Sequence, residues 1–258
     1  MISHIQKFRT ALAEGKVCLG AGISFSDPAV TEALCDSVDF LWIDLEHTPI
    51  SLESLMAHLI AARAGGAPAL VRVPVNDVAW IKRVLDIGAE GIIVPQVQNA
   101  DDVRQAVRAC RYAPLGARGM GPRRPSNYGR DGGDDFRRRS NEQIFVAVQI
   151  ETVEAYEDLD RIVAVEGLDS LAIGPYDLSS SFGIIGQVDD PRIAEAISTI
   201  ASKARGAGLY VGIGVSASAD MAARFVGLGV QWLQVGCDFS YLVNGADDLF
   251  RSVRGRVE

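Results

Sequence analysis

Short apolar runs alternate with helical patterns along the whole chain. The runs are rich in β-branched residues and apolar at nearly every position, which is typical of parallel strands buried on both faces. They cover residues 17–21, 40–45, 69–73, 91–95, 145–150, 170–174, 209–215 and 230–235. Eight strand–helix units close most naturally into a barrel. The sequence therefore predicts one (β/α)8 (TIM) barrel domain over residues 1–258, preceded by a short amphipathic N-terminal helix.

The segments between the runs carry signals for the start and end of helices. Asp and Asn favour N-terminal caps, and glycine favours a left-handed residue after a helix. The expected N-terminal caps are Asp27, Asn76, Asn99 and Asp190, and the expected C-terminal glycines are Gly65, Gly88, Gly206 and Gly229. Residues 113–141 break this rhythm because they are rich in Gly, Pro and Arg. A loop of this length is functional or disordered, and it could fold over the mouth of the barrel.

Composition excludes several classes of protein. The net charge of −8 offers no basic face for nucleic acid. No signal peptide and no apolar stretch long enough for a bilayer is evident, so we expect a cytoplasmic protein without a membrane partner. The four cysteines are scattered and lack zinc-site spacing, which favours buried free thiols.

In this fold the active site forms at the carboxyl ends of the strands, so the polar residues there are the candidates. The second expected strand ends in Asp44-Leu45-Glu46-His47, and the third carries Arg72. The fifth ends in Gln149 and Glu151, and the sixth runs into Tyr176-Asp177. Several charged side chains at neighbouring strand ends are hard to explain by stability alone.

Glu151 and Asp177 follow adjacent strands and would share one edge of the mouth. Two carboxylates there suit a hard divalent cation such as Mg²⁺ or Mn²⁺. The alternative is that they cap the following helices or pair with arginines. Gln149 shares a face with Glu151, because residues two apart in a strand point to the same side.

His47 and Arg72 are the other candidates for chemistry. His47 follows a strand beside Asp44 and Glu46, and a carboxylate neighbour can orient an imidazole that acts as general base. A structural histidine is the alternative. Arg72 is a charge within an apolar strand, and its partner is a carboxylate of either a ligand or the protein.

The positions of the lysines argue against a lysine-dependent aldolase, and one glycine-rich stretch gives a weak signal for phosphate. Lys7 and Lys16 precede the first strand, and Lys82 and Lys203 fall within expected helices, so none easily reaches the strand ends to form a Schiff base. Enolate formation would then depend on a metal. Residues 211–216 are glycine-rich and lie where many barrels hold phosphate, but they match no P-loop, and the glycines could serve tight packing instead. We expect no nucleotide cofactor.

Taken together, these motifs resemble the HpcH/HpaI aldolase family, the metal-dependent pyruvate aldolases. The matching segments extend over nearly the whole chain, and their number and order make the resemblance specific. They are WIDLEHTP, LVRVP, IKRVLDIGAEGIIVPQVQNADD, RYAPLGARGMG, VQIET and GPYDLSSSFG.

The resemblance implies a role for each site residue. Glu151 and Asp177 correspond to metal ligands, which would bind Mg²⁺, Mn²⁺ or Co²⁺. His47 corresponds to the base with Asp44 nearby, and Arg72 to the group that stabilises the enolate. The remaining roles are a substrate contact for Gln149, a carboxylate-binding backbone around Tyr176-Asp177, and an aspartate, Asp86, that supports the histidine of a neighbouring subunit.

The implied reaction is reversible aldol cleavage of a 4-hydroxy-2-oxo acid to pyruvate, or hydroxypyruvate, and an aldehyde. Family members are commonly hexamers built as trimers of dimers, so we expect a homo-oligomer. Two departures concern the pocket. Many relatives have glycine at Leu45, and Tyr176 replaces a smaller residue.

Three other functions compete with the aldolase. A metal-enolate decarboxylase of the oxaloacetate type, or an enzyme resembling macrophomate synthase, would share the metal and Arg72 but would need no base for a C4 hydroxyl. A citrate-lyase-like or malyl-thioester lyase is more distant, since no coenzyme A signature is evident. A non-catalytic barrel that binds a keto acid would be expected to lack one of Glu151, Asp177, Arg72 and His47.

Overall fold

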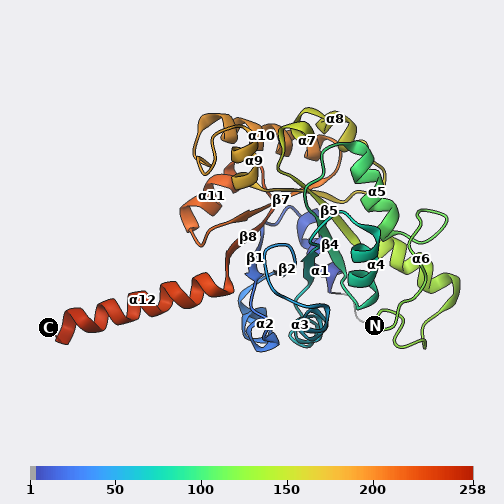
Figure 1. The fold of residues 1–258 in the computed structure, drawn as a ribbon, viewed down its shortest axis with the longest axis horizontal. Coiled ribbons are helices and arrows are strands. Elements are labelled where there is room, and N and C mark those ends of the chain that lie inside the picture. Colours follow the sequence, from blue (N-terminus) through green and yellow to red (C-terminus); the bar gives the residue numbers. More distant parts are fainter. Residues whose placement is uncertain (1–3, 258) are drawn as a thin grey trace.

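The computed structural model describes residues 4–257 and contains a closed barrel of eight parallel strands with helices around it (Figure 1). Each strand pairs in parallel with its neighbours in the sequence, and β8 returns to β1. The strands are β1 Cys18–Ile23, β2 Phe40–Asp44, β3 Ala69–Arg72, β4 Gly91–Val94, β5 Phe145–Ile150, β6 Ser170–Ile173, β7 Tyr210–Val215 and β8 Trp232–Cys237. The predicted barrel is confirmed, with strand ends that differ by at most two residues.

Helices follow the strands in the expected alternation. They are α1 Ile5–Ala13, α2 Pro28–Leu34, α3 Leu52–Ala64, α4 Val78–Asp86, α5 Ala100–Cys110, α6 Gly133–Gln143, α7 Val153–Glu157, α8 Leu159–Ile162, α9 Pro175–Ser181, α10 Pro191–Gly206, α11 Ala219–Gly227 and α12 Asp238–Val257, with a 3₁₀ turn at Cys35–Ser37. Within residues 4–257, no helix combines the length and the apolar character needed to cross a bilayer.

Most of the predicted helix caps are present. The side chains of Asp27, Asn99 and Asp190 accept hydrogen bonds from the first turns of α2, α5 and α10. Asp77 rather than Asn76 caps α4, because the Asn76 side chain donates instead to the Asp102 carbonyl.

The expected C-terminal glycines divide into two pairs. Gly88 and Gly229 adopt the left-handed backbone that ends a helix, with φ of 111° and 101°. Gly65 and Gly206 do not. The left-handed position after α3 is Gly66, and the one after α10 is Gly208.

An aromatic cluster fills the base of the barrel, meaning the end at which the strands begin. Phe8 of α1 packs against Phe40, Phe145 and Trp232, with ring centroids 5.1, 5.4 and 6.1 Å away. All four rings are buried, so α1 closes the base and supports the strands beneath the mouth.

The long segment 113–141 lies at the base of the barrel, so the expectation that it could cover the mouth is wrong. Arg118 pairs with Asp86 at the end of α4, and Arg124 donates to the Ile87 carbonyl. The reason is topological, because the segment follows the carboxyl end of α5, and helices run back from the mouth to the base. It also contains most of α6, a helix that the polar composition of the segment did not indicate.

The last helix, α12, projects away from the barrel instead of lying against it (Figure 1). Its buried residue is Asp238 at its start. Large apolar side chains along its length are exposed, among them Leu242, Leu249 and Phe250.

Candidate active site at the mouth of the barrel

A cavity of about 570 Å³ lies at the carboxyl ends of the strands. Six of the eight residues predicted for the site come together here, on β2 and the loop after it, on β3 and β5, and at the start of α9. Asp44, His47, Arg72, Gln149, Tyr176 and Asp177 line this cavity. Glu151 is 1% exposed and lies behind the wall formed by Gln149 and Gly174. Asp86 is not in the cavity.

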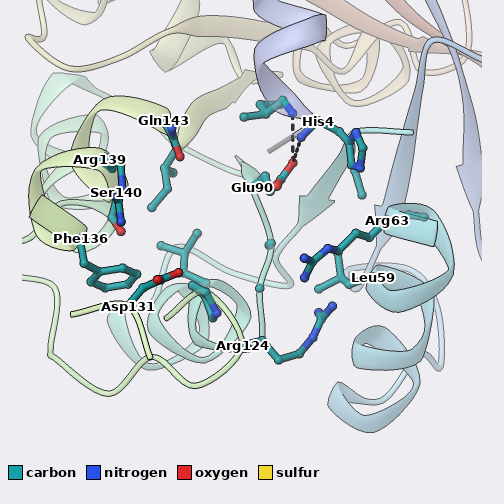
Figure 2. A pocket seen from close by; sticks show the side chains of 18 of the residues that line it. His4, Leu59, Arg63, Glu90, Arg124, Asp131, Phe136, Arg139, Ser140 and Gln143 are labelled. Carbon is teal, nitrogen blue, oxygen red and sulfur yellow. Dashed lines mark hydrogen bonds between the residues drawn. The ribbon is translucent and has the colours of Figure 1, made fainter. Parts of the chain in front are cut away.

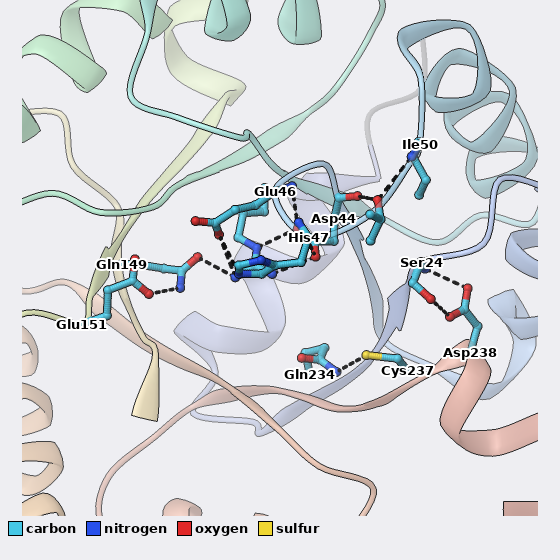
Figure 3. A network of polar contacts seen from close by, with 12 residues as sticks. Ser24, Asp44, Glu46, His47, Ile50, Gln149, Glu151, Gln234, Cys237 and Asp238 are labelled. Atoms are coloured by element: carbon cyan, nitrogen blue, oxygen red, sulfur yellow. Dashed lines mark hydrogen bonds and ion pairs between the residues drawn. The ribbon is translucent and has the colours of Figure 1, made fainter. Parts of the chain in front are cut away.

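Arg72 joins Asp44, Glu46 and Gln149 into one polar network, and Figure 3 shows these three partners. Its Nε and one terminal nitrogen donate to the two carboxylate oxygens of Asp44, each at 2.8 Å. The other terminal nitrogen lies 3.0 Å from Glu46 Oε2 and 3.4 Å from Gln149 Oε1. Burial lowers the pKa of the guanidinium, but the carboxylates of Asp44, Glu46 and Glu151 together outweigh it, so the pKa of Arg72 is raised. The side chain is therefore a fixed positive charge.

Glu151 is a buried carboxylate whose environment supplies too little positive charge. Its oxygens accept hydrogen bonds from the Gln96 backbone N–H at 2.7 Å and from Gln149 Nε2 at 2.6 Å. Burial raises its pKa to about 7, and the charges of Glu46 and Asp177 add to that effect. A nearby cation would stabilise the ionised form.

Gly174 makes room for this carboxylate. A Cβ at residue 174 would clash with the Glu151 carboxylate and would lie 3.3 Å from Gln149 Nε2. The strand end of β6 therefore approaches β5 closely, and α9 starts directly afterwards with Pro175. This places Asp177, which is solvent-exposed, beside Glu151 and Glu46, since its charge raises the pKa of both.

Within residues 4–257, no three His, Cys, Asp or Glu side chains form a ready-made metal cluster. Two carboxylates suffice for a cation such as Mg²⁺, which keeps several waters and usually takes one or two protein carboxylates. Glu151 and Asp177 therefore fit such an ion.

His47 lies at the rim of the cavity with its side chain 65% exposed. The nearest carboxylate is that of Glu46, whose Oε2 is 3.7 Å from His47 Nε2. Asp44 contacts the backbone N–H groups of Glu46 and His47 and the side chain of Arg72. Asp44 thus positions the loop and the guanidinium, and Glu46 is the carboxylate facing the imidazole.

Asp86 is the last residue of α4 and lies at the base, at the opposite end of the barrel from His47. Its carboxylate accepts a hydrogen bond of 2.8 Å from Arg118, whose guanidinium lies 4.6 Å from the Tyr112 ring centroid. The segment 113–141 thus brings Arg118 to a carboxylate at the end of α4. Asp86 can reach a histidine at a mouth only in another subunit.

A second polar cluster at the mouth is formed by Asp238, a residue expected after the eighth strand but given no role from the sequence. The Asp238 carboxylate accepts hydrogen bonds from the backbone N–H groups of Ser24 and Phe25 and from the Ser24 hydroxyl (Figure 3). It therefore anchors the loop after β1 to the start of α12. Gln234 lies next to Cys237, and both line the cavity.

Glu46 was expected beside His47 from the sequence, but its contact with Arg72 was not. Asp238 carried a weaker signal, since its role depends on contacts with a loop more than 200 positions away. Gln96 contributes through its backbone, at a φ of 56°, which the side-chain pattern does not reveal.

The lysines lie away from this cavity, whose described lining contains none. Lys203 pairs with Asp160, and Lys16 pairs with Glu14.

The thiol nearest the site is Cys237, and burial raises its pKa to about 11, so it is protonated at neutral pH.

Comparison with known proteins identifies the family. The HpcH/HpaI aldolase/citrate lyase model matches residues 24–245. The chain belongs to this family. A 4-hydroxy-2-oxo-heptane-1,7-dioate aldolase of Shigella sonnei (strain Ss046) is 38% identical over 245 residues, which covers 94% of this chain and 92% of the relative. A 4-hydroxy-2-oxovalerate aldolase of Rhodococcus jostii (strain RHA1) is 37% identical over 241 residues, which covers 92% of each chain.

A solved structure supports the same assignment. The family protein from Burkholderia cenocepacia J2315 superposes with a TM-score of 0.90 at 29% identity, covering 96% of this chain and 99% of that chain. The barrel, its eight strands and the family resemblance inferred from the sequence motifs therefore agree.

Proposed function

We propose that this protein is a carbon–carbon lyase that cleaves 4-hydroxy-2-oxo acids reversibly into pyruvate, or hydroxypyruvate, and an aldehyde, with a divalent cation held by Glu151 and Asp177. The observation that carries the proposal is the set of contacts that joins Asp44, Arg72, Gln149 and Glu151 at the mouth. These contacts hold the positive charge of Arg72 in a fixed place at the mouth. A fixed positive charge can stabilise the negative charge that develops on an enolate oxygen.

The cation would be Mg²⁺, Mn²⁺ or Co²⁺, because carboxylate and water ligands accept all three. When bound, it would act as a Lewis acid toward the keto and carboxylate oxygens of the substrate. Glu151 is suited to hold it, since burial and the charges of Glu46 and Asp177 disfavour its ionised form, and a cation would offset both effects. Asp177 supplies a second oxygen ligand from the exposed side.

Arg72 would stabilise the negative charge that develops on the substrate oxygen during enolate formation. Its guanidinium is held by Asp44, Glu46 and Gln149, so little reorganisation is needed when the charge appears. The backbone around Tyr176 and Asp177 would hold the substrate carboxylate, and Gln149 would orient the keto acid.

His47 would accept the proton of the C4 hydroxyl in cleavage and return it to the alkoxide in synthesis. Its exposed position at the rim suits contact with the aldehyde half of the substrate, which must enter and leave. Glu46 lies on the other side of the imidazole and would stabilise its protonated form.

We also propose that the protein works as a homo-oligomer, a hexamer arranged as a trimer of dimers, in the cytoplasm. The projecting α12 and its exposed side chains, such as Leu249 and Phe250, favour association with another copy. In that assembly Asp86 would approach the His47 of a neighbouring subunit. The partners are then a small keto acid, an aldehyde and other copies of the chain, without nucleic acid or membrane.

Pyruvate release from 4-hydroxy-2-oxo acids tests the proposal. Activity should disappear after treatment with EDTA and return with Mg²⁺, Mn²⁺ or Co²⁺. Activity indifferent to chelation would contradict the metal roles of Glu151 and Asp177. Release of pyruvate from oxaloacetate alone would favour a decarboxylase instead.

A further inference from the structure

The groups assigned to the keto acid lie in one part of the cavity at the mouth, on β3, β5 and the start of α9. The rest of the lining comes mainly from the ends of β1, β7 and β8 and from the first two turns of α12, within residues 22–24, 214–217 and 234–244. This part is termed the acceptor wall. Because β1 lies beside β2 in the barrel, the acceptor wall adjoins the loop that carries His47. The aldehyde half of the substrate, whose hydroxyl His47 would deprotonate, would therefore contact it.

The described side chains that line the acceptor wall are uncharged. Ala217 and Phe239 are exposed apolar residues, and Ser216 and Asn244 are exposed neutral polar ones. Among residues 4–257, Arg72 is the one lysine or arginine that lines the cavity, and two carboxylates already hold it. The acceptor wall therefore suits apolar groups and neutral hydrogen-bonding groups of a ligand better than it suits an anion.

A buried carboxylate, that of Asp238, lies directly behind the acceptor wall. Asp238 is 4% exposed, and its neighbours in the sequence, Cys237 and Phe239, both line the cavity. Its carboxylate accepts hydrogen bonds from the backbone N–H groups of Ser24 and Phe25, at 2.8 and 2.9 Å. These donors are neutral, so they hold the carboxylate in place without bringing a positive charge to this side of the mouth.

The thiol of Cys237 indicates the sign of the charge felt at the acceptor wall. Burial raises the pKa of this thiol to about 11. The negative charges of Asp238 and Asp44 raise it further, each by more than the positive charge of Arg72 lowers it. The surroundings thus disfavour an anion at this position. A carboxylate carried by the aldehyde would meet the same repulsion.

Protonation of His47 does not reverse this balance. The carboxylate of Glu46 lies 3.7 Å from His47 Nε2 and 3.0 Å from a terminal nitrogen of Arg72. The positive charges of Arg72 and a protonated His47 are therefore matched by the negative charges of Asp44 and Glu46. The charge of Asp238 remains in addition.

The arginines that line the other cavity lie too far away to help. Arg63 and Arg124 line a cavity at the base of the barrel, beside Glu90 (Figure 2). In the proposed oligomer, a neighbouring subunit would bring Asp86 close to His47. Because Asp86 already pairs with Arg118, that contact would add no net positive charge.

We propose that the aldehyde partner of the reaction is an uncharged aliphatic aldehyde, and that the acceptor wall disfavours aldehydes that carry a carboxylate. This inference rests on the proposed aldolase function and adds the class of the second substrate. A carboxylate on the aldehyde half would lie against apolar side chains such as Phe239, close to Asp238, without a cation to pair with. An anion removed from water in this way is unfavourable, whereas an alkyl chain gains from the same contact.

Aldol synthesis tests the proposal through pyruvate consumption at saturating Mn²⁺ and constant ionic strength. The acceptors compared are 4-oxobutanoate, its methyl ester and 4-methylpentanal, which has the shape of 4-oxobutanoate with an isopropyl group in place of the carboxylate. The wild-type protein should show kcat/KM at least tenfold higher for each uncharged aldehyde than for 4-oxobutanoate. Equal or better use of 4-oxobutanoate would overturn the proposal.

A positive charge added to the acceptor wall should change this preference. In Ser216→Arg, the ratio of kcat/KM for 4-oxobutanoate to that for 4-methylpentanal should rise at least tenfold, and Asn244→Arg should act in the same direction. Ser198→Arg adds the same charge at an exposed position of α10, outside the cavity, and should leave the ratio unchanged. An unchanged ratio in both cavity variants, or an equal rise in Ser198→Arg, would contradict the placement of the aldehyde at this wall.

Failure of this inference can be told apart from failure of the proposed function. If the protein is not an aldolase, none of the three aldehydes will cause metal-dependent consumption of pyruvate, and both proposals fall. If it is an aldolase for acidic aldehydes, 4-oxobutanoate will consume pyruvate fastest, and the inference about the acceptor wall alone is overturned.

Discussion

Replacement of Arg72 by lysine keeps the positive charge at the mouth but removes the forked arrangement of N–H donors, so it tests which of the two matters. Arg72 contacts two oxygens of Asp44 at 2.8 Å, Glu46 at 3.0 Å and Gln149 at 3.4 Å. A lysine offers one compact ammonium group and cannot reproduce this fork. Charge remains in Arg72→Lys, but the directed donor toward the developing enolate oxygen is lost.

The magnitude of the effect follows from these contacts. Loss of one preorganised donor to a developing oxyanion lowers kcat by about 10²–10³, or about 2.7–4 kcal/mol. Loss of a charge-assisted hydrogen bond to Asp44 costs roughly 1.5–3 kcal/mol of stability. For a chain of this size, that corresponds to a fall in Tm of roughly 3–12 °C.

The assay is steady-state pyruvate release at saturating metal ion, with Mn²⁺ affinity measured on the same protein. We expect kcat to fall while Mn²⁺ affinity stays within about threefold of wild type, because Arg72 does not bind the cation. Arg104→Lys, at an exposed ion pair with Asp101, is the control and should leave both values unchanged. A kcat within tenfold of wild type in folded Arg72→Lys would refute the role given to the guanidinium.

Three further predictions address the site and the fold. Gly174→Ala should weaken Mn²⁺ binding at least tenfold, because the new Cβ would displace the Glu151 carboxylate, and a titration followed by electron paramagnetic resonance would measure it. His47→Ala should lower aldol cleavage by about 10²–10⁴ but spare oxaloacetate decarboxylation, which needs no base at a C4 hydroxyl. Burial lowers the pKa of His58 in the folded protein. Below about pH 6.5 the unfolded chain therefore binds more protons than the folded one, and the free energy of unfolding should fall as the pH falls. In urea unfolding between pH 7 and 5, His58→Gln should remove a slope of at most about 1.4 kcal/mol per pH unit.

Each of these predictions has its own contradicting result. Gly206→Ala is the control for Gly174→Ala, since a Cβ at residue 206 meets open space. Equal Mn²⁺ affinity in both glycine variants would show that Gly174 does not position Glu151. Equal loss of cleavage and decarboxylation in His47→Ala would remove its specific role as base. An unchanged pH slope in His58→Gln would mean that His58 is not the titrating group.

The barrel could be predicted from the sequence because each strand is buried on both faces. A run such as Phe145–Ile150 is apolar at nearly every position and is buried throughout, so pattern and structure coincide. The signal is weaker for α6, where Phe136 is the buried residue in an otherwise polar helix. The periodicity of α12 predicts a helix but not the direction in which it leaves the barrel, because that direction depends on tertiary contacts.

Site residues at the ends of strands could be predicted from the sequence. Contacts made by residues on loops could not. Arg72 and Glu151 occupy positions that the strand pattern fixes. Glu46 lies on a loop, and the alternating pattern that orients side chains in a strand does not apply there. Its position between Arg72 and His47 is therefore known only from the structure.

The most direct test of the central claim is deuterium exchange at the methyl group of pyruvate, followed by proton NMR in D₂O without any aldehyde. Enolate formation at this site predicts exchange that requires Mg²⁺ or Mn²⁺, disappears with EDTA and falls at least a hundredfold in Arg72→Lys. Exchange that persists after chelation, or that is unaffected by Arg72→Lys, would contradict an enolate stabilised by a metal ion and this arginine.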